Sequence, residues 1–168
     1  MKTAGLLIAC AALAVTALET LSRQKRQLDT LRELCALLER MAVELGERST
    51  PLGALMDELA DEASALLQPF LSNLRLSLQK LDEQSFSESW RQAVDRQLPL
   101  PAAQKAALGR LGGYLGRYSG EQQRQAVLSV RDELLRELRR CESSAPDRQR
   151  LTAGLTAAAI AMLLIINL

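Results

Sequence analysis

The two ends of this 168-residue chain are almost free of charge, and this feature constrains its architecture more than any other. Residues 3–18 and 151–168 contain no Asp, Glu, Lys or Arg. All 20 acidic residues and 20 of the 21 basic residues lie between these two segments. Each segment is near the lower end of the roughly 17–25 apolar residues that cross a bilayer as a helix. The pattern predicts transmembrane helices over residues 1–21 and 151–168, with one neutral domain over residues 22–150 between them.

Basic residues border both apolar segments on the side that faces the middle of the chain. Such residues are preferentially retained on the cytoplasmic side of a membrane. Because the two borders agree, the pattern predicts a two-pass protein whose middle domain is cytoplasmic and whose two ends face outward. The bordering residues are Arg23, Lys25, Arg26, Arg139, Arg140, Arg148 and Arg150.

The N-terminal segment also has features of a leader that is cleaved or lipidated. Residues 15–17 resemble a signal-peptidase site, and the string "LIAC" at residues 7–10 resembles a lipobox. Against both, the apolar run before Cys10 is short, and the basic residues after the segment disfavour translocation of the middle domain. A retained membrane anchor is therefore the preferred interpretation. A signal-peptide-cleaved or lipid-anchored helical protein of unknown role is the alternative.

The middle of the chain predicts helices and no sheet. Leu and Ala dominate and aromatic residues make up 3% of the chain, a composition that favours helix. No helix breaker separates the first amphipathic stretch from the apolar N-terminal segment, so one helix can run through both. The predicted fold class is all-α, a cytoplasmic bundle of about five to six helices between two transmembrane helices. Apolar residues of the first stretch recur at steps of three and four: Leu28, Leu31, Leu34, Cys35, Leu38, Met41, Ala42 and Leu45.

Capping residues divide the rest of the middle domain into further helices. Thr50 is expected as an N-cap, with Pro51 as the first helical residue after it. A capping box that starts at Ser85 begins the helix that carries Trp90, the only Trp of the chain. Trp90 is expected as an anchor of the core or of an interface. Pro101 is expected as the first residue of the next helix.

The helix predicted from Pro101 to Tyr118 carries several glycines. At about 100° per residue, Gly109, Gly113 and Gly116 share one face, nearly opposite the leucines of the same helix. Small residues at this spacing let a second helix approach closely. We therefore expect a flat strip that packs against a neighbouring helix or binds a partner.

The next helix is predicted to begin at Ser119, which has Gln122 three residues later in a capping box. This helix leads toward the C-terminal apolar segment and is the nearest candidate neighbour for the glycine strip. The residues proposed for helix packing or for a partner interface are Trp90, Gly109, Gly113, Gly116, Ser119 and Gln123.

Composition also excludes most kinds of chemistry. The chain has no His, which removes Ser-His-Asp and Cys-His catalysis and every His-containing metal site. It lacks the phosphate-binding string G-x-x-x-x-G-K-[ST] and any C-x-x-C pair, so its three cysteines are expected to be reduced. The carboxylates at positions 57, 58, 61 and 62 are expected as a solvated helix face. We expect no enzyme, cofactor or metal and, at a net charge of +1, no nucleic-acid partner.

Several strings match the pattern of one known family. They are "TPLGALMDELA" at residues 50–60, the isolated Trp90, and "LGGYLGRYSGEQQ" at residues 111–123, set between a short N-terminal membrane helix and a C-terminal one. On these features nearly the whole chain resembles stage III sporulation protein AB of endospore-forming bacteria. The most specific matching positions are Leu115, Gly116, Ser119 and Gln123. One departure is Gly120, where the family usually has an acidic residue.

The resemblance implies a non-enzymatic membrane component of the channel complex between mother cell and forespore. It implies a soluble part similar to the helical cytoplasmic domains of type II secretion and pilus platform proteins, which lie beside a secretion ATPase. The implied partners are the stage III sporulation ATPase (the AA component), other channel subunits and membrane lipid, with a homo-oligomer as a further option. The implied location is the mother-cell membrane that faces the forespore.

Overall fold

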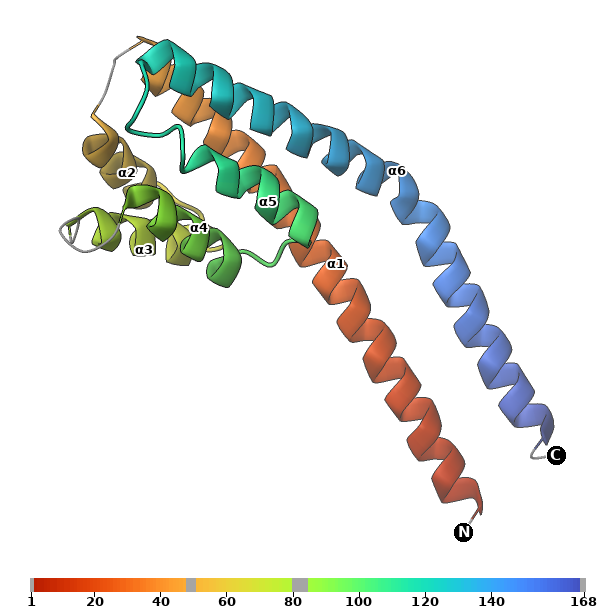
Figure 1. Ribbon diagram of the computed structural model, residues 1–168. Helices are drawn as coiled ribbons and strands as arrows, with labels where there is room; N and C mark the ends of the chain where they lie inside the picture. Colours follow the sequence, from red (N-terminus) through yellow and green to blue (C-terminus); the bar gives the residue numbers. More distant parts are fainter. Residues whose placement is uncertain (1, 48–50, 80–84, 167–168) are drawn as a thin grey trace. The chain divides into compact units, whose positions relative to one another are not determined.

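The computed structural model is helical throughout the part of the chain that it describes, residues 2–47, 51–79 and 85–166. Side chains are described for residues 15–16, 19–46, 51–79, 85–143 and 154. These residues form six helices and no strand, as the composition predicts (Figure 1). The helices are α1 (Lys2–Glu47), α2 (Leu52–Asp61), α3 (Gln68–Gln79), α4 (Phe86–Gln97), α5 (Ala102–Leu111) and α6 (Gly120–Ile166).

Two compact units divide the chain. One is Asp29–Leu138, and the other combines Met1–Leu28 with Arg139–Leu168. The long helices α1 and α6 each contribute to both units. The expected run of one helix from the N-terminal apolar segment into the amphipathic stretch is confirmed, because α1 is unbroken. No helix among the described residues has a stretch that is long and apolar enough to cross a membrane. Most side chains of residues 3–18 and 151–168 lie outside the described ones.

Within the unit Asp29–Leu138, the second half of α1 and the first half of α6 lie side by side and antiparallel (Figure 1). The carbonyl of Leu45 faces Gly120, and the Arg131 guanidinium lies 3.6 Å from the Glu39 carboxylate. Both helices bury their apolar faces, since burial of that surface is the main favourable term in folding. The residues of α1 that the periodicity predicts are buried from Leu31 to Leu45, but Leu28 is half-buried, and Thr30 and Leu37 are buried although they were not predicted. α6 buries Val127, Val130, Leu134 and Leu138.

The four short helices pack in chain order, α2 on α3, α3 on α4 and α4 on α5. Arg75 of α3 joins the first pair, with its guanidinium 2.8 Å from Asp57 and 2.9 Å from Asp61. Both carboxylates are exposed, as predicted for a solvated face, so this ion pair contributes little to stability. The described residues contain no group of three or more metal-ligating side chains.

Two predicted helix starts are wrong by one residue. Pro51 and Pro101 are N-caps and not first helical residues, because their ψ angles of 139° and 153° are extended. Each proline carbonyl accepts the first helical hydrogen bond, at 3.0 Å from Leu55 N and 3.1 Å from Lys105 N. Thr50, the predicted N-cap, lies outside the described residues.

The predicted glycine helix is also shorter than expected. α5 ends at Leu111 and not at Tyr118. The chain then closes into a turn, in which Gly113 N donates to Arg110 O at 3.1 Å and Tyr114 N donates to Leu111 O at 2.9 Å. Three residues separate these donors from their acceptors, as in a 3₁₀ turn. Residues 112–119 thus form a compact connection between α5 and α6, which we name the glycine turn.

Candidate functional site

Trp90 lies at the centre of the helical unit. Its side chain is 1% exposed, and its indole Nε1–H donates a hydrogen bond to the Leu108 carbonyl at 2.7 Å. The Phe70 ring meets it edge-on with centroids 5.4 Å apart, and the Phe86 ring lies 5.9 Å away. A buried Trp needs such a partner for its N–H. Trp90 therefore joins α3, α4 and α5 as a core anchor, one of its two predicted roles.

Gly112 makes the closest approach to this anchor. A Cβ atom at Gly112 would lie 2.9 Å from both Cβ and Cδ1 of Trp90. Backbone and indole can therefore touch only because position 112 has no side chain. Gly112 is not among the interface residues predicted from the sequence. The sequence feature that could have indicated this contact is the spacing, since position 112 follows Leu108 by one helical turn and therefore lies on the buried face.

The three predicted interface glycines do not form one strip. Gly109 lies within α5, whereas Gly113 and Gly116 lie in the glycine turn, so no shared helix face exists. A Cβ at Gly109 or Gly113 would make only ordinary contacts, at 3.7 Å from Arg91 and 3.5 Å from the Arg110 carbonyl. Gly116 has a φ of +76°, a conformation that favours glycine. The prediction of a common face is wrong because the helix ends before two of its three members.

Ser119 and Gln123 hold the glycine turn in place. Ser119 N–H donates to Gln122 Oε1 at 3.3 Å, which is one half of the predicted capping box at the start of α6. The Gln123 side-chain amide accepts from Gly116 N–H at 3.2 Å and donates to the Tyr118 carbonyl at 2.6 Å. These two residues therefore set the path of the turn, and any role toward a partner stays a prediction.

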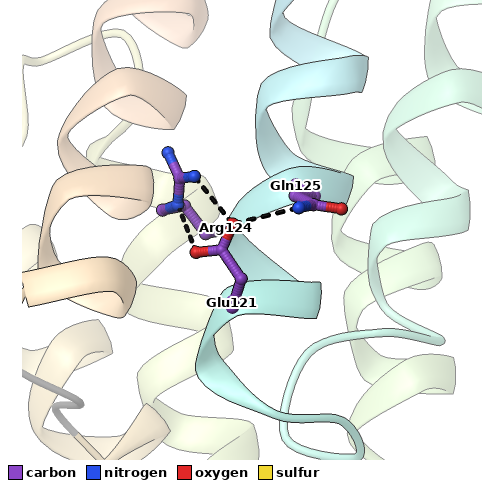
Figure 2. A network of polar contacts seen from close by, with 3 residues as sticks. All are labelled: Glu121, Arg124 and Gln125. Atoms are coloured by element: carbon purple, nitrogen blue, oxygen red, sulfur yellow. Dashed lines mark hydrogen bonds and ion pairs between the residues drawn. The ribbon is translucent and has the colours of Figure 1, made fainter.

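The first turn of α6 carries a polar network, shown in Figure 2. Arg124 contacts both carboxylate oxygens of Glu121 at 2.7 Å, and Gln125 Nε2 donates to Glu121 at 3.0 Å. Hydrogen bonds from Arg124 and then Gln125 lower the pKa of Glu121 to about 2. A Cβ atom at Gly46 would lie 2.6 Å from Cδ of Arg124, which is too close for any side chain at that position while Arg124 stays in place. Gly46 thus lets this network sit against α1.

The two tyrosines of the glycine turn are exposed. Tyr114 is 46% and Tyr118 52% exposed, and their ring centroids are 5.4 Å apart. They line a groove of about 470 Å³ between the end of α5, the glycine turn and α6. The other aromatics, by contrast, cluster around the buried Trp90. Exposed tyrosines are enriched at protein interfaces, so this pair is the best candidate for a contact site.

The tyrosine pair is not among the residues predicted from the sequence. The sequence feature that could have indicated the pair is the spacing of four residues between Tyr114 and Tyr118 in the glycine-rich segment. The predicted helix through Tyr118, however, gives the two rings another arrangement than the observed turn does. The groove that they line also includes Arg110, Gln122 and Gln125, which come from the end of α5 and from α6. The site is therefore made by three consecutive parts of the chain.

Comparison with known proteins identifies the family. The profile of stage III sporulation protein AB matches residues 2–168. This chain belongs to the stage III sporulation protein AB family. A solved structure titled "Stage III sporulation protein AB (SpoIIIAB)" has the same fold, with a TM-score of 0.64 at 19% identity. The match covers 73% of this chain and 98% of that one, and no curated protein matches in sequence.

As a member of the stage III sporulation protein AB family, the chain is a sporulation protein with a helical bundle. The similarity to the solved structure is a similarity of fold. The four family-specific positions of the sequence analysis all fall in or beside the glycine turn. Leu115 is buried at 2% exposure, and Gly116 has the positive φ of the turn. Ser119 and Gln123 form hydrogen bonds within the turn and at the start of α6.

The two described cysteines of this family member should react very differently with alkylating reagents. Both are free, but Cys35 is buried and Cys141 is half-buried. Burial raises the pKa of the Cys35 thiol to about 11, against a smaller opposite effect of Arg131. Only the thiolate reacts, and burial also shields the Cys35 sulfur from reagent, so iodoacetamide at pH 8 should modify Cys141 much faster than Cys35. Peptide mass spectrometry checks this; in urea the rates should converge, and equal rates without urea would contradict the burial.

Proposed function

We propose that this chain is a non-enzymatic, membrane-anchored platform subunit of the channel between mother cell and forespore, and that it docks the cognate stage III sporulation ATPase at the membrane. The observation that carries the proposal is the family match over residues 2–168, which includes both apolar ends. The resemblance of the soluble part to secretion platform domains supports the ATPase as partner. Other channel subunits, membrane lipid and further copies of the chain are additional partners in this proposal.

The chemistry of the chain supports a role without catalysis. The sequence has no His and no phosphate-binding loop. Gln123, one of the predicted interface residues, uses its side-chain amide to hold the glycine turn.

The proposed location is the mother-cell membrane, with two spans and a cytoplasmic middle domain. The apolar ends and the basic residues that border them support this arrangement. A reporter inserted after Arg48 should be active on the cytoplasmic side, and one fused to the C-terminus on the opposite side. Reporters on the same side would contradict the two-pass arrangement. Intact mass of the extracted protein decides the alternative, since a cleaved or lipidated N-terminus changes it.

Docking is tested by equilibrium binding of the purified ATPase to the full chain in detergent micelles. We expect saturable binding, and we expect no ATP hydrolysis by this chain alone. Hydrolysis that co-purifies with the chain in the absence of the ATPase would refute the platform role. Absence of binding across the accessible concentration range would refute docking.

A further inference from the structure

The surface of α5 and the glycine turn has an unusual charge pattern. Between Asp95 and Glu121 the sequence contains no carboxylate. The cations of this stretch are Arg96, Lys105, Arg110 and Arg117. Arg110 pairs with Glu133 of α6 at 2.7 Å. Arg117 and the neighbouring Arg91 of α4 are exposed and form no ion pair within the described residues. Arg91 shares a pocket with the carboxylates Glu88 and Asp95, so the net positive charge of this surface comes mainly from Arg96 and Arg117, which form no ion pair in the part of the chain that the structure describes.

Two grooves flank α5 on this surface. The tyrosine groove lies toward α6, and a second groove of about 520 Å³ lies toward α4. The floor of the second groove is formed by Ala102, Ala106 and Gly109, which follow one another at helical spacing on the exposed side of α5. None of these side chains is larger than a methyl group. Such a floor accepts a ridge of side chains from another helix at the usual interaxial distance of about 8–10 Å.

Arg110 lines both grooves, so the two grooves share a border residue. Arg91 and Lys105 line the second groove, where a single carboxylate, Asp95, also lies. The Lys105 ammonium donates to the Asp95 backbone carbonyl at 2.5 Å. Exposed aromatic rings, a floor of small residues and basic side chains thus occur along the two borders of α5.

We propose that this α5 surface, the exposed side of α5 with the Tyr114–Tyr118 pair, binds an acidic helix of a partner protein. Charge complementarity identifies the sign of the partner segment, and the small-residue floor identifies its helical form. The tyrosines supply the apolar contacts that dominate binding energy. The inference deepens the proposed function and rests on it, because it names the surface and the chemistry of the docked segment.

An anionic lipid surface is the competing explanation for the positive charge. Lipid-binding segments concentrate about 4–8 Lys or Arg in one cluster. Here α5 itself carries two cations, Lys105 and Arg110, of which Arg110 is paired with Glu133, and a groove lies on either side of the helix. A flat headgroup layer would leave these grooves empty, whereas the side chains of a helix fill them.

Charge reversal and truncation on this surface test the proposal, with the purified cognate ATPase as the probe and the full chain in detergent. Arg91→Glu with Arg117→Glu should weaken binding by at least about tenfold, and so should Tyr114→Ala with Tyr118→Ala. Arg136→Glu on α6 and Leu76→Ala on α3 are matched controls, because both residues are exposed elsewhere. The controls should change Kd by less than about twofold. Circular dichroism verifies that each variant is folded.

The outcomes separate this inference from the proposed function. If the wild-type chain binds the ATPase and the surface variants bind equally well, the surface is wrong and docking stands. If the wild-type chain does not bind the ATPase, docking fails, and a photocrosslinker at Tyr118 in sporulating cells decides the surface. A crosslinked peptide that is acidic and helix-forming supports the inference. A basic or neutral crosslinked peptide overturns it, and so does the absence of any protein crosslink. If no protein is crosslinked and the charge-reversed chain also loses binding to phosphatidylglycerol vesicles, the positive charge serves lipid binding and the inference is overturned.

Discussion

Replacement of Trp90 by alanine is expected to lower the free energy of unfolding by about 3–5 kcal/mol, the usual range for loss of a large buried aromatic. The side chain is 1% exposed and contacts Phe70 and Phe86, so its removal leaves a cavity between α3, α4 and α5. It also removes the donor to the Leu108 carbonyl. Urea titration followed by far-UV circular dichroism measures the change, since the variant lacks the only Trp fluorophore.

Trp90→Phe is the matched control for this prediction. It keeps an aromatic ring in the core but loses the hydrogen bond to Leu108, so it should cost less than the alanine variant. A loss below about 1 kcal/mol in Trp90→Ala would mean that the three helices hold together without this anchor. Equal losses in the two variants would assign the effect to what both remove, the indole N–H and the part of the ring that phenyl does not fill.

Alanine at Gly112 and alanine at Gly109 are expected to change stability in opposite directions. At Gly112 the new Cβ would lie 2.9 Å from Trp90, so the core must shift, at a cost of about 1–3 kcal/mol. The backbone there is right-handed helical, with φ −56° and ψ −25°, so packing alone accounts for the cost. At Gly109 the new Cβ meets only Arg91 at 3.7 Å. Better helix propensity should then stabilise by about 0.5–1 kcal/mol.

The same urea titrations on the two single variants check this pair. Because both substitutions add one methyl group within four residues of each other, the comparison isolates the effect of the local contact. A stabilised Gly112→Ala variant would show that the indole does not press on the backbone. A destabilised Gly109→Ala variant would show that the second groove is narrower than the structure has it.

Periodicity predicted the helices well because burial follows it directly. The row from Leu31 to Leu45 in α1 is buried at the positions where steps of three and four place it. The capping signal at Ser85 is also confirmed, with its side chain 3.4 Å from Glu88 N. Such features depend on residues close together in the chain, and local sequence therefore suffices to predict them.

The glycine turn could not be predicted in the same way. A helix through Tyr118 satisfies the leucine spacing, but α5 ends at Leu111, and the positive φ of Gly116 and the Gln123 hydrogen bonds shape the turn that follows. The close contact of Gly112 depends on Trp90, which lies 22 positions earlier in the chain. The tyrosine groove likewise needs α6 beside the turn. Contacts between distant residues decide these features, and no pattern within the segment contains them.

Flotation of the ATPase with vesicles tests the central claim most directly, because it requires both a membrane anchor and docking. The full chain is reconstituted into liposomes, mixed with purified cognate ATPase and centrifuged through a density gradient. The account predicts that the ATPase rises with vesicles that contain the chain and stays at the bottom with empty vesicles. An ATPase that stays at the bottom while the chain floats would contradict docking, and a chain that does not float would contradict membrane anchorage.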